Sequence, residues 1–139
     1  MVNAVSNSTV PKFSIVLGNS YGAGNYAMCG KAYDPRLIVA WPTAKIAVMG
    51  GSQAAKVLTQ IQVSSQKRKG EEVDEKAEKE LFDKIKSRYD DQTEPYYAAA
   101  RLWVDAIINP IETRNWISMA IEAANNAPIE KFNVGAIQT

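Results

Sequence analysis

The chain has 139 residues, of which 46% are hydrophobic, a composition that suits one domain with a core and argues against two. Its 16 basic and 15 acidic residues give a net charge of +1, so charge gives no argument for a nucleic-acid or membrane partner. The absence of histidine and the single cysteine exclude a His-based triad, zinc-ribbon spacing and an internal disulfide within this chain. We therefore expect no metal site, and we expect Cys29 to be buried and structural rather than a nucleophile.

The first ten residues predict the end of a helix whose apolar face carries Val2, Val5 and Val10, without a capping signal of its own. This abrupt start suggests a piece of a longer protein. The segment lacks the charged start and apolar core of a signal peptide, and nothing in the chain predicts a membrane span. A cytoplasmic location is the resulting expectation.

Residues 12–30 are the most informative stretch, because a strand pattern is followed by a glycine-rich turn and then a helix. The short apolar run at 13–17 predicts a buried strand, and the helix is predicted over 24–32 and ended by Asp34-Pro35. Gly22 and Gly24 permit backbone conformations that a Cβ would block. Free amides at the start of a helix carry its positive end, so they can bind a phosphate or an oxyanion.

The next segments predict two further strands and a helix. A strand at 37–41 is stopped by Pro42, a third strand covers 45–49, and Gly50-Gly51 opens an apolar helix that continues through Ile61. The predicted order is strand, helix, two strands and helix, which indicates an α/β fold.

Residues 67–94 carry more than half of the charges, with apolar residues every fourth position from Val73 to Tyr89. This pattern predicts a solvated amphipathic helix, and a charged docking surface is the alternative.

Two helices are predicted in the last third of the chain. One starts at Glu94-Pro95 and would bury Tyr96, Ala99, Leu102, Trp103 and Ala106. The other starts at Asn109-Pro110-Ile111-Glu112, with a capping side chain, a proline and a carboxylate in the favoured order, and runs to about Ala124. We interpret Tyr96, Trp103 and Trp116 as core or interface anchors rather than a ligand cage.

Three explanations fit the glycine turn at 22–24. A dinucleotide site would require an acidic residue at the end of the following strand, but that strand ends in Ala40-Trp41-Pro42 and Asp34 comes too early. A P-loop motif is absent. An oxyanion hole, in which adjacent amides stabilise a developing negative charge, remains open beside simple tight packing.

Several motifs together resemble one family. They are Val10-Pro11-Lys12, Tyr-Gly-Ala-Gly-Asn-Tyr-Ala-Met-Cys-Gly at 21–30, Ala40-Trp41-Pro42, Ala-Lys-Ile-Ala-Val-Met-Gly-Gly at 44–51, and Asn-Ala-Pro-Ile-Glu-Lys at 126–131. In this order they resemble the carboxyltransferase (β) subunit of biotin-dependent acyl-CoA carboxylases. The details are most similar to the methylcrotonyl-CoA carboxylase branch, with propionyl- and geranyl-CoA carboxylases as relatives.

The resemblance implies a crotonase-like (ClpP/crotonase) fold of ββα units. It also implies that residues 1–139 are one fragment, the C-terminal part of the biotin-side domain, with 67–94 as a charged helical insertion. In the family the active site lies between the N-terminal half of one subunit and the C-terminal half of another, so this chain would hold part of a site and would be inactive alone. The implied partners are an acyl-CoA, a biotin carboxylase or biotin carrier subunit, and further copies of the chain.

The implied reaction moves a carboxyl group from carboxybiotin to an acyl-CoA such as methylcrotonyl-CoA or propionyl-CoA. Biotin would be attached to a carrier protein and not to this chain. By motif, the backbone N–H groups of Ala23 and Gly24 match the oxyanion hole that holds the biotin oxygen. Gly22, Asn25 and Tyr26 are the matching substrate-binding positions, and core packing is the alternative for Tyr26.

Other assignments stay open. Gly50 and Gly51 offer either a second amide cradle or tight packing. A non-catalytic subunit that docks the biotin carrier and a biotin-dependent decarboxylase of the glutaconyl-CoA type are the alternative functions. In a eukaryote the expected location would be the mitochondrial matrix.

Overall fold

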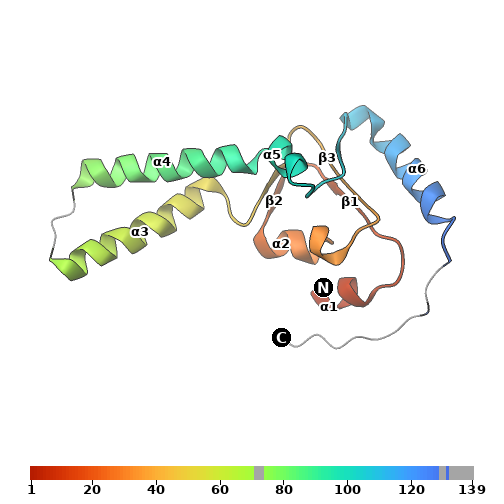
Figure 1. The fold of residues 1–139 in the computed structure, drawn as a ribbon, viewed down its shortest axis with the longest axis horizontal. Coiled ribbons are helices and arrows are strands. Elements are labelled where there is room, and N and C mark those ends of the chain that lie inside the picture. Colours follow the sequence, from red (N-terminus) through yellow and green to blue (C-terminus); the bar gives the residue numbers. More distant parts are fainter. Residues whose placement is uncertain (71–73, 129–130, 132–139) are drawn as a thin grey trace.

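The computed structural model describes residues 1–70, 74–128 and 131, and short parallel strands alternate with helices along the chain (Figure 1). Two single turns of 3-10 helix, Lys31–Tyr33 and Pro110–Glu112, complete the described elements. The strands and α-helices are α1 (Val2–Asn7), β1 (Phe13–Val16), β2 (Asn19–Tyr21), α2 (Gly22–Ala27), β3 (Leu37–Ala40), β4 (Lys45–Ala47), α3 (Gly51–Lys69), α4 (Glu75–Thr93), α5 (Pro95–Ala100), β5 (Ala106–Ile107) and α6 (Thr113–Ala124).

The strands form two small parallel sheets in the described chain, one ordered β1-β3-β5 and the other β2-β4. Phe13 pairs with Leu37 in the first sheet and Asn19 pairs with Lys45 in the second. The chain therefore passes twice through the same unit of two strands and a helix, first as β1-β2-α2 and then as β3-β4-α3. This repeat confirms the predicted α/β class with ββα units.

β3 lies at the centre of the core, because it is paired on both sides by β1 and β5. Val39 and Ala40 of this strand have no exposed surface. Ala40 of β3, Ala44 of the β3–β4 connection and Ala98 of α5 are all fully buried in the same cluster. The core cluster consists of Ile38, Ala40, Ala44, Ile46, Ala98 and Val104.

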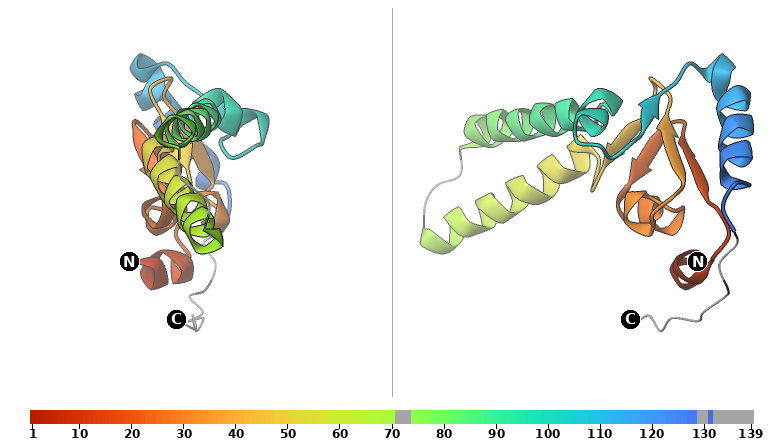
Figure 2. Two further views of the ribbon diagram at one scale, coloured as in Figure 1. Left: turned by 90° about the vertical axis from the view of Figure 1, so that its left-hand side faces the viewer. Right: turned by 45° about the vertical axis from the view of Figure 1, so that its right-hand side comes forward.

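Helices α3 and α4 pack along one another and form an arm that projects away from the sheets (Figures 1 and 2). α3 continues to Lys69 and ends at Gly70, whose φ of 74° places it in the left-handed region. The predicted charged helix over 67–94 is thus partly wrong, because residues 67–69 belong to α3, and Val73 lies outside the described residues. α4 confirms the solvated helix: within this fully described element only Thr93 is buried.

The segment after α5 is the main departure from the sequence prediction. The predicted helix ends at Ala100 because Leu102 has a φ of 59°, which no α-helix accommodates, and Ala106 belongs to strand β5 instead. Tyr96 and Leu102 are exposed rather than buried, at 66% and 77%. Strand β2 was not expected either, since Asn19 and Ser20 do not give an apolar strand pattern.

Both ends of the described chain carry helices that make little core. α1 ends at Asn7, so Val10 lies beyond its predicted face and is 56% exposed. The predicted start of the last helix is confirmed, since the Asn109 side chain accepts a hydrogen bond from the Ile111 amide at 3.1 Å before α6 begins. Among the described residues, none of α6 is buried. None of the described helices combines the length and apolarity that a membrane span requires.

Candidate functional site

The start of α2 presents open backbone amides directly after β2. Gly22 has a φ of 54°, and a Cβ there would lie 2.9 Å from the Val48 carbonyl oxygen, so this turn requires glycine. The amides of Ala23 and Gly24 fall in the first turn, where helix geometry supplies no carbonyl partner, and the Tyr21 side chain does not cap them. A Cβ on Gly24 would meet no described atom within 4 Å. Open space therefore lies at the position that a side chain of residue 24 would occupy.

A set of short contacts fixes α2 on β1 and β2. The Asn25 amide group donates to Ser20 Oγ at 2.8 Å, and the Gly30 amide donates to the Asn25 carbonyl at 2.8 Å. Ser14 Oγ donates to the carbonyl of Cys29 at 2.7 Å. Cys29 itself is buried, as the sequence predicts. The helix start is thus held by groups that do not depend on a bound ligand.

A pocket of about 210 Å³ lies next to the α2 start and brings the three predicted substrate-binding residues together. Gly22, Asn25 and Tyr26 all line it, whereas Ala23 and Gly24 are not among its lining residues. Tyr26 is 53% exposed and meets the Tyr33 ring edge-to-face, so it is not a core residue. The other lining residues are Lys31, Ala32, Ile38, Ile46, Ala47, Val48 and Trp103.

Two of these lining residues, Lys31 and Trp103, were missed as site residues in the sequence. Lys31 Nζ forms an ion pair with Asp105 at 3.1 Å, and the same carboxylate accepts the Ile38 amide at 2.8 Å. Asp105 therefore connects the pocket rim to the central strand. No local sequence motif indicates Lys31 as a site residue. For Trp103, the spacing predicts a position on the buried face of a helix, but that helix ends at Ala100.

The second glycine pair, Gly50-Gly51, is closely packed. A Cβ on Gly51 would lie 2.2 Å from Asp90 Oδ1 and 3.1 Å from the Lys86 carbonyl oxygen. The carboxylate of Asp90 thus lies beside Gly51 at the start of α3, where its negative charge would repel an anion. This arrangement favours tight packing over a second amide cradle.

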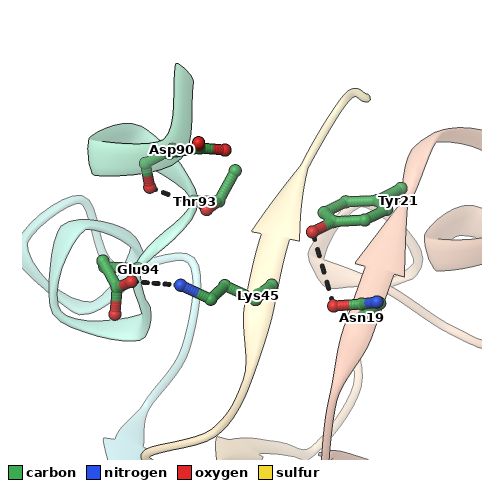
Figure 3. Close-up of polar contacts among 6 residues, drawn as sticks. All are labelled: Asn19, Tyr21, Lys45, Asp90, Thr93 and Glu94. Atoms are coloured by element: carbon green, nitrogen blue, oxygen red, sulfur yellow. Dashed lines mark hydrogen bonds and ion pairs between the residues drawn. The ribbon is translucent and has the colours of Figure 1, made fainter. Parts of the chain in front are cut away.

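Lys45 and Glu94 form an ion pair that joins β4 to the α4–α5 junction (Figure 3). The hydrogen bond with Glu94 raises the pKa of Lys45 above its ordinary value, and burial opposes this shift only in part. On the neighbouring strand β2, the Tyr21 hydroxyl contacts Asn19 Oδ1 (Figure 3). At the end of α4, Thr93 Oγ1 donates to the Asp90 carbonyl at 2.8 Å (Figure 3). Lys45 is therefore held protonated and is unsuited to act as a neutral amine.

Comparison with known proteins relates nearly the whole chain to one family. The model of the carboxyl transferase domain family matches residues 1–135. The chain is 46% identical over 138 residues to the mitochondrial methylcrotonoyl-CoA carboxylase beta chain of Arabidopsis thaliana, covering 99% of this chain and 24% of that protein. It is 48% identical over 136 residues to a probable methylcrotonoyl-CoA carboxylase beta chain of Drosophila melanogaster, covering 96% and 24%.

Solved structures agree with this relationship. The match to the beta subunit of P. aeruginosa geranyl-CoA carboxylase has a TM-score of 0.80 and 36% sequence identity. It covers 97% of this chain and 25% of the geranyl-CoA carboxylase chain. The match to the transcarboxylase 12S structure, described as a hexamer assembly, has a TM-score of 0.75 and 33% sequence identity. It covers 94% of this chain and 23% of the transcarboxylase chain. These matches confirm the crotonase-like fold class. The chain spans about a quarter of the length of these relatives.

Proposed function

Because the chain belongs to the carboxyl transferase domain family, we propose that it supplies part of the carboxyltransferase component of a biotin-dependent acyl-CoA carboxylase. The reaction would transfer a carboxyl group from carboxybiotin to an acyl-CoA such as methylcrotonyl-CoA or propionyl-CoA. The observation that carries this proposal is the pair of uncapped amides at Ala23 and Gly24, with open space beside Gly24 and a pocket of about 210 Å³ next to the start of the same helix.

The residues present fit the group that the family implies. A biotin ureido oxygen needs hydrogen-bond donors and room to approach them, and the glycine at position 24 leaves room that a side chain would narrow. Bound carboxybiotin would supply the carboxyl group and the base that activates the acyl-CoA. The biotin would be carried by a separate protein rather than attached to this chain.

The amides of Ala23 and Gly24 would act as an oxyanion hole for the biotin oxygen. They are positioned before any ligand arrives, because Asn25, Ser20 and Gly30 fix the helix that presents them. Preorganised donors of this kind stabilise developing charge without reorganisation, and loss of one typically costs about 3 kcal/mol in the transition state. Gly22, Asn25 and Tyr26 would contact the substrate from the pocket wall, with Tyr26 contributing to acyl preference.

The remaining partners follow from the same family. The chain would belong to the biotin-side domain and would work with a biotin carboxylase or biotin carrier subunit, an acyl-CoA and further copies of itself in an oligomer. Its location would be cytoplasmic, or the mitochondrial matrix in a eukaryote. The described part of the predicted insertion, residues 67–70 and 74–94, would not take part in the chemistry.

The deciding experiment replaces Gly24 in the assembled carboxylase and measures carboxylation with a panel of acyl-CoAs. Gly24→Pro removes one donor and should lower turnover by roughly 100-fold or more. Gly24→Ala keeps the amide and should lose much less than the proline variant does. Cys29→Ser serves as the control outside the site and should keep most activity in folded protein. Equal activity of Gly24→Pro and wild type, or loss of activity only in Cys29→Ser, would refute the amide site.

A further inference from the structure

Trp103 lines two neighbouring cavities. It lines the pocket of about 210 Å³ beside α2, and it also lines a second cavity of about 340 Å³ that reaches Tyr89 of α4 and Tyr97 of α5. Residues 46–48 border both cavities as well. Trp103 and residues 46–48 therefore form the wall that the two cavities share.

The local backbone is shaped to hold this ring in place. Leu102 adopts a φ of 59°, a conformation that L-residues other than glycine rarely take, and its own side chain is 77% exposed. The Trp103 amide donates to the Ala98 carbonyl at 2.9 Å, and the indole meets the Tyr97 ring edge-to-face at 6.0 Å. The Arg101 guanidinium lies 3.4 Å from the centre of the same Tyr97 ring.

Burial in the core does not explain this arrangement, because Trp103 keeps 41% of its surface exposed. Backbone strain persists where the surrounding structure enforces it, and such positions gather at ligand sites. The positive φ of Leu102 lies in the turn between α5 and β5, directly before Trp103, which lines the pocket. The strained backbone at Leu102 therefore lies next to a pocket wall, as expected at a ligand site.

The chemistry of the pocket interior identifies what it would accept. Ile38, Ile46, Ala47 and Val48 present hydrocarbon, so the interior suits an alkyl chain. The polar groups of Asn25, Tyr26 and Lys31 also line the pocket. The ureido group of biotin has two N–H donors and a carbonyl that need polar partners, so the hydrocarbon part of the wall suits an alkyl group and not the ureido group. A cavity of about 150 Å³ accepts a benzene-sized group, so the pocket beside α2 has room for a short branched acyl group.

We propose that Trp103 determines acyl chain length, because its indole closes the short pocket beside α2 from the second cavity. This inference rests on the proposed function, since it takes the ligand to be the acyl part of a thioester. Removal of the indole would join the two cavities and admit a longer chain.

The test measures binding of N-acetylcysteamine thioesters to the chain by NMR, so that it requires no CoA-binding region. Affinities for the isovaleryl and octanoyl thioesters are taken from the amide shifts of residues 46–48. The wild type should prefer isovaleryl. In Trp103→Ala the octanoyl-to-isovaleryl affinity ratio should rise by at least about tenfold, because several additional CH₂ groups become buried. The octanoyl-induced shifts should then extend to Tyr89 and Tyr97.

Two further variants make the result decisive. Tyr96→Ala removes a neighbouring aromatic ring that lines neither cavity, and it should leave the ratio unchanged. Trp103→Phe should give an intermediate ratio, and it replaces the alanine variant if that variant does not fold. An unchanged ratio in a folded Trp103 variant overturns the inference, and so does thioester binding that leaves residues 46–48 unshifted.

The outcome is separable from that of the proposed function. If neither thioester binds to the wild type, the acyl assignment of this pocket is wrong. Carboxyl transfer is then still decided by the turnover of the Gly24 variants in the assembled enzyme. If the ratio shifts as expected while Gly24→Pro keeps full turnover, the acyl pocket stands and the amide site fails.

Discussion

Gly30→Ala should destabilise the chain, because Gly30 is where α2 is packed most tightly against its own connection. A Cβ at this position would lie 2.0 Å from Asn25 Oδ1 and 2.9 Å from the Asn25 carbonyl oxygen. The side-chain oxygen can move only by straining the bond from the Asn25 amide group to Ser20 Oγ. The carbonyl oxygen belongs to the helix backbone and accepts the Gly30 amide at 2.8 Å, so α2 itself would have to shift.

The expected magnitude follows from two opposing effects. Gly30 has a φ of −66°, which alanine adopts without strain, so the substitution would gain about 0.4–1 kcal/mol from the unfolded state. Overpacking of a buried position costs about 1–3 kcal/mol, and weakening the Asn25–Ser20 hydrogen bond adds about 1 kcal/mol. The net loss of unfolding free energy should therefore be about 1–3 kcal/mol.

Gly24→Ala is the matched comparison, at a glycine within α2 itself. A Cβ there meets no described atom within 4 Å, and alanine is favoured over glycine in helices by up to about 1 kcal/mol. Urea denaturation followed by circular dichroism should therefore rank the variants as Gly24→Ala, wild type and Gly30→Ala, from most to least stable. The packing argument is refuted if Gly30→Ala equals or exceeds the wild type in stability.

Three further predictions concern the ion pairs and the exposed helix. Because Glu94 raises the pKa of Lys45 above its ordinary value, the stabilisation that Lys45→Met removes, about 0.2–1 kcal/mol, should be constant from pH 7 up to the ordinary lysine pKa of 10.5 and vanish as pH rises through the folded-state pKa. Unfolding titrations from pH 7 to strongly alkaline solution would show no such loss if the pair were unimportant. Asp105→Ala leaves the buried Ile38 amide unpaired and should lower the free energy of unfolding by about 1–3 kcal/mol. Asp105→Asn keeps an acceptor for this amide and should lose less. Equal urea midpoints for the two variants would contradict this prediction. The apolar surface of α6 should drive self-association, and Met119→Lys, at a position 54% exposed, should shift sedimentation toward monomer; a strictly monomeric wild type would exclude it.

The sequence was most informative where local chemistry decides the structure. Apolar β-branched runs located β1 and β3, and the side chain of Asn109 marked the start of the last helical segment through its own hydrogen bond. The change from strand to helix at the glycine motif was predicted to within two residues, since α2 starts at Gly22, whose φ of 54° favours glycine, instead of at residue 24. The helix also ends at Ala27 and does not continue to residue 32.

The errors arose where tertiary packing overrides local pattern. Ala106 fits a helical face by spacing, but pairing with Val39 makes it part of a strand. Asn19 and Ser20 have no strand propensity of note, yet β4 supplies a parallel partner for them. Trp103 was missed as a pocket residue because its position depends on Leu102 leaving helical geometry, which no sequence signal announces.

The central position of β3 has a consequence for the order in which the molecule assembles. Its neighbours β1 and β5 come from opposite ends of the described chain, and Asp105 hydrogen-bonds to Ile38 across 67 positions of sequence. Pairings of such separation must close long loops before they yield any gain, whereas the α3–α4 arm requires only contacts close in sequence. During synthesis the arm can therefore form before β5 has paired with β3. The core is complete only when residues 104–108 have packed against β3.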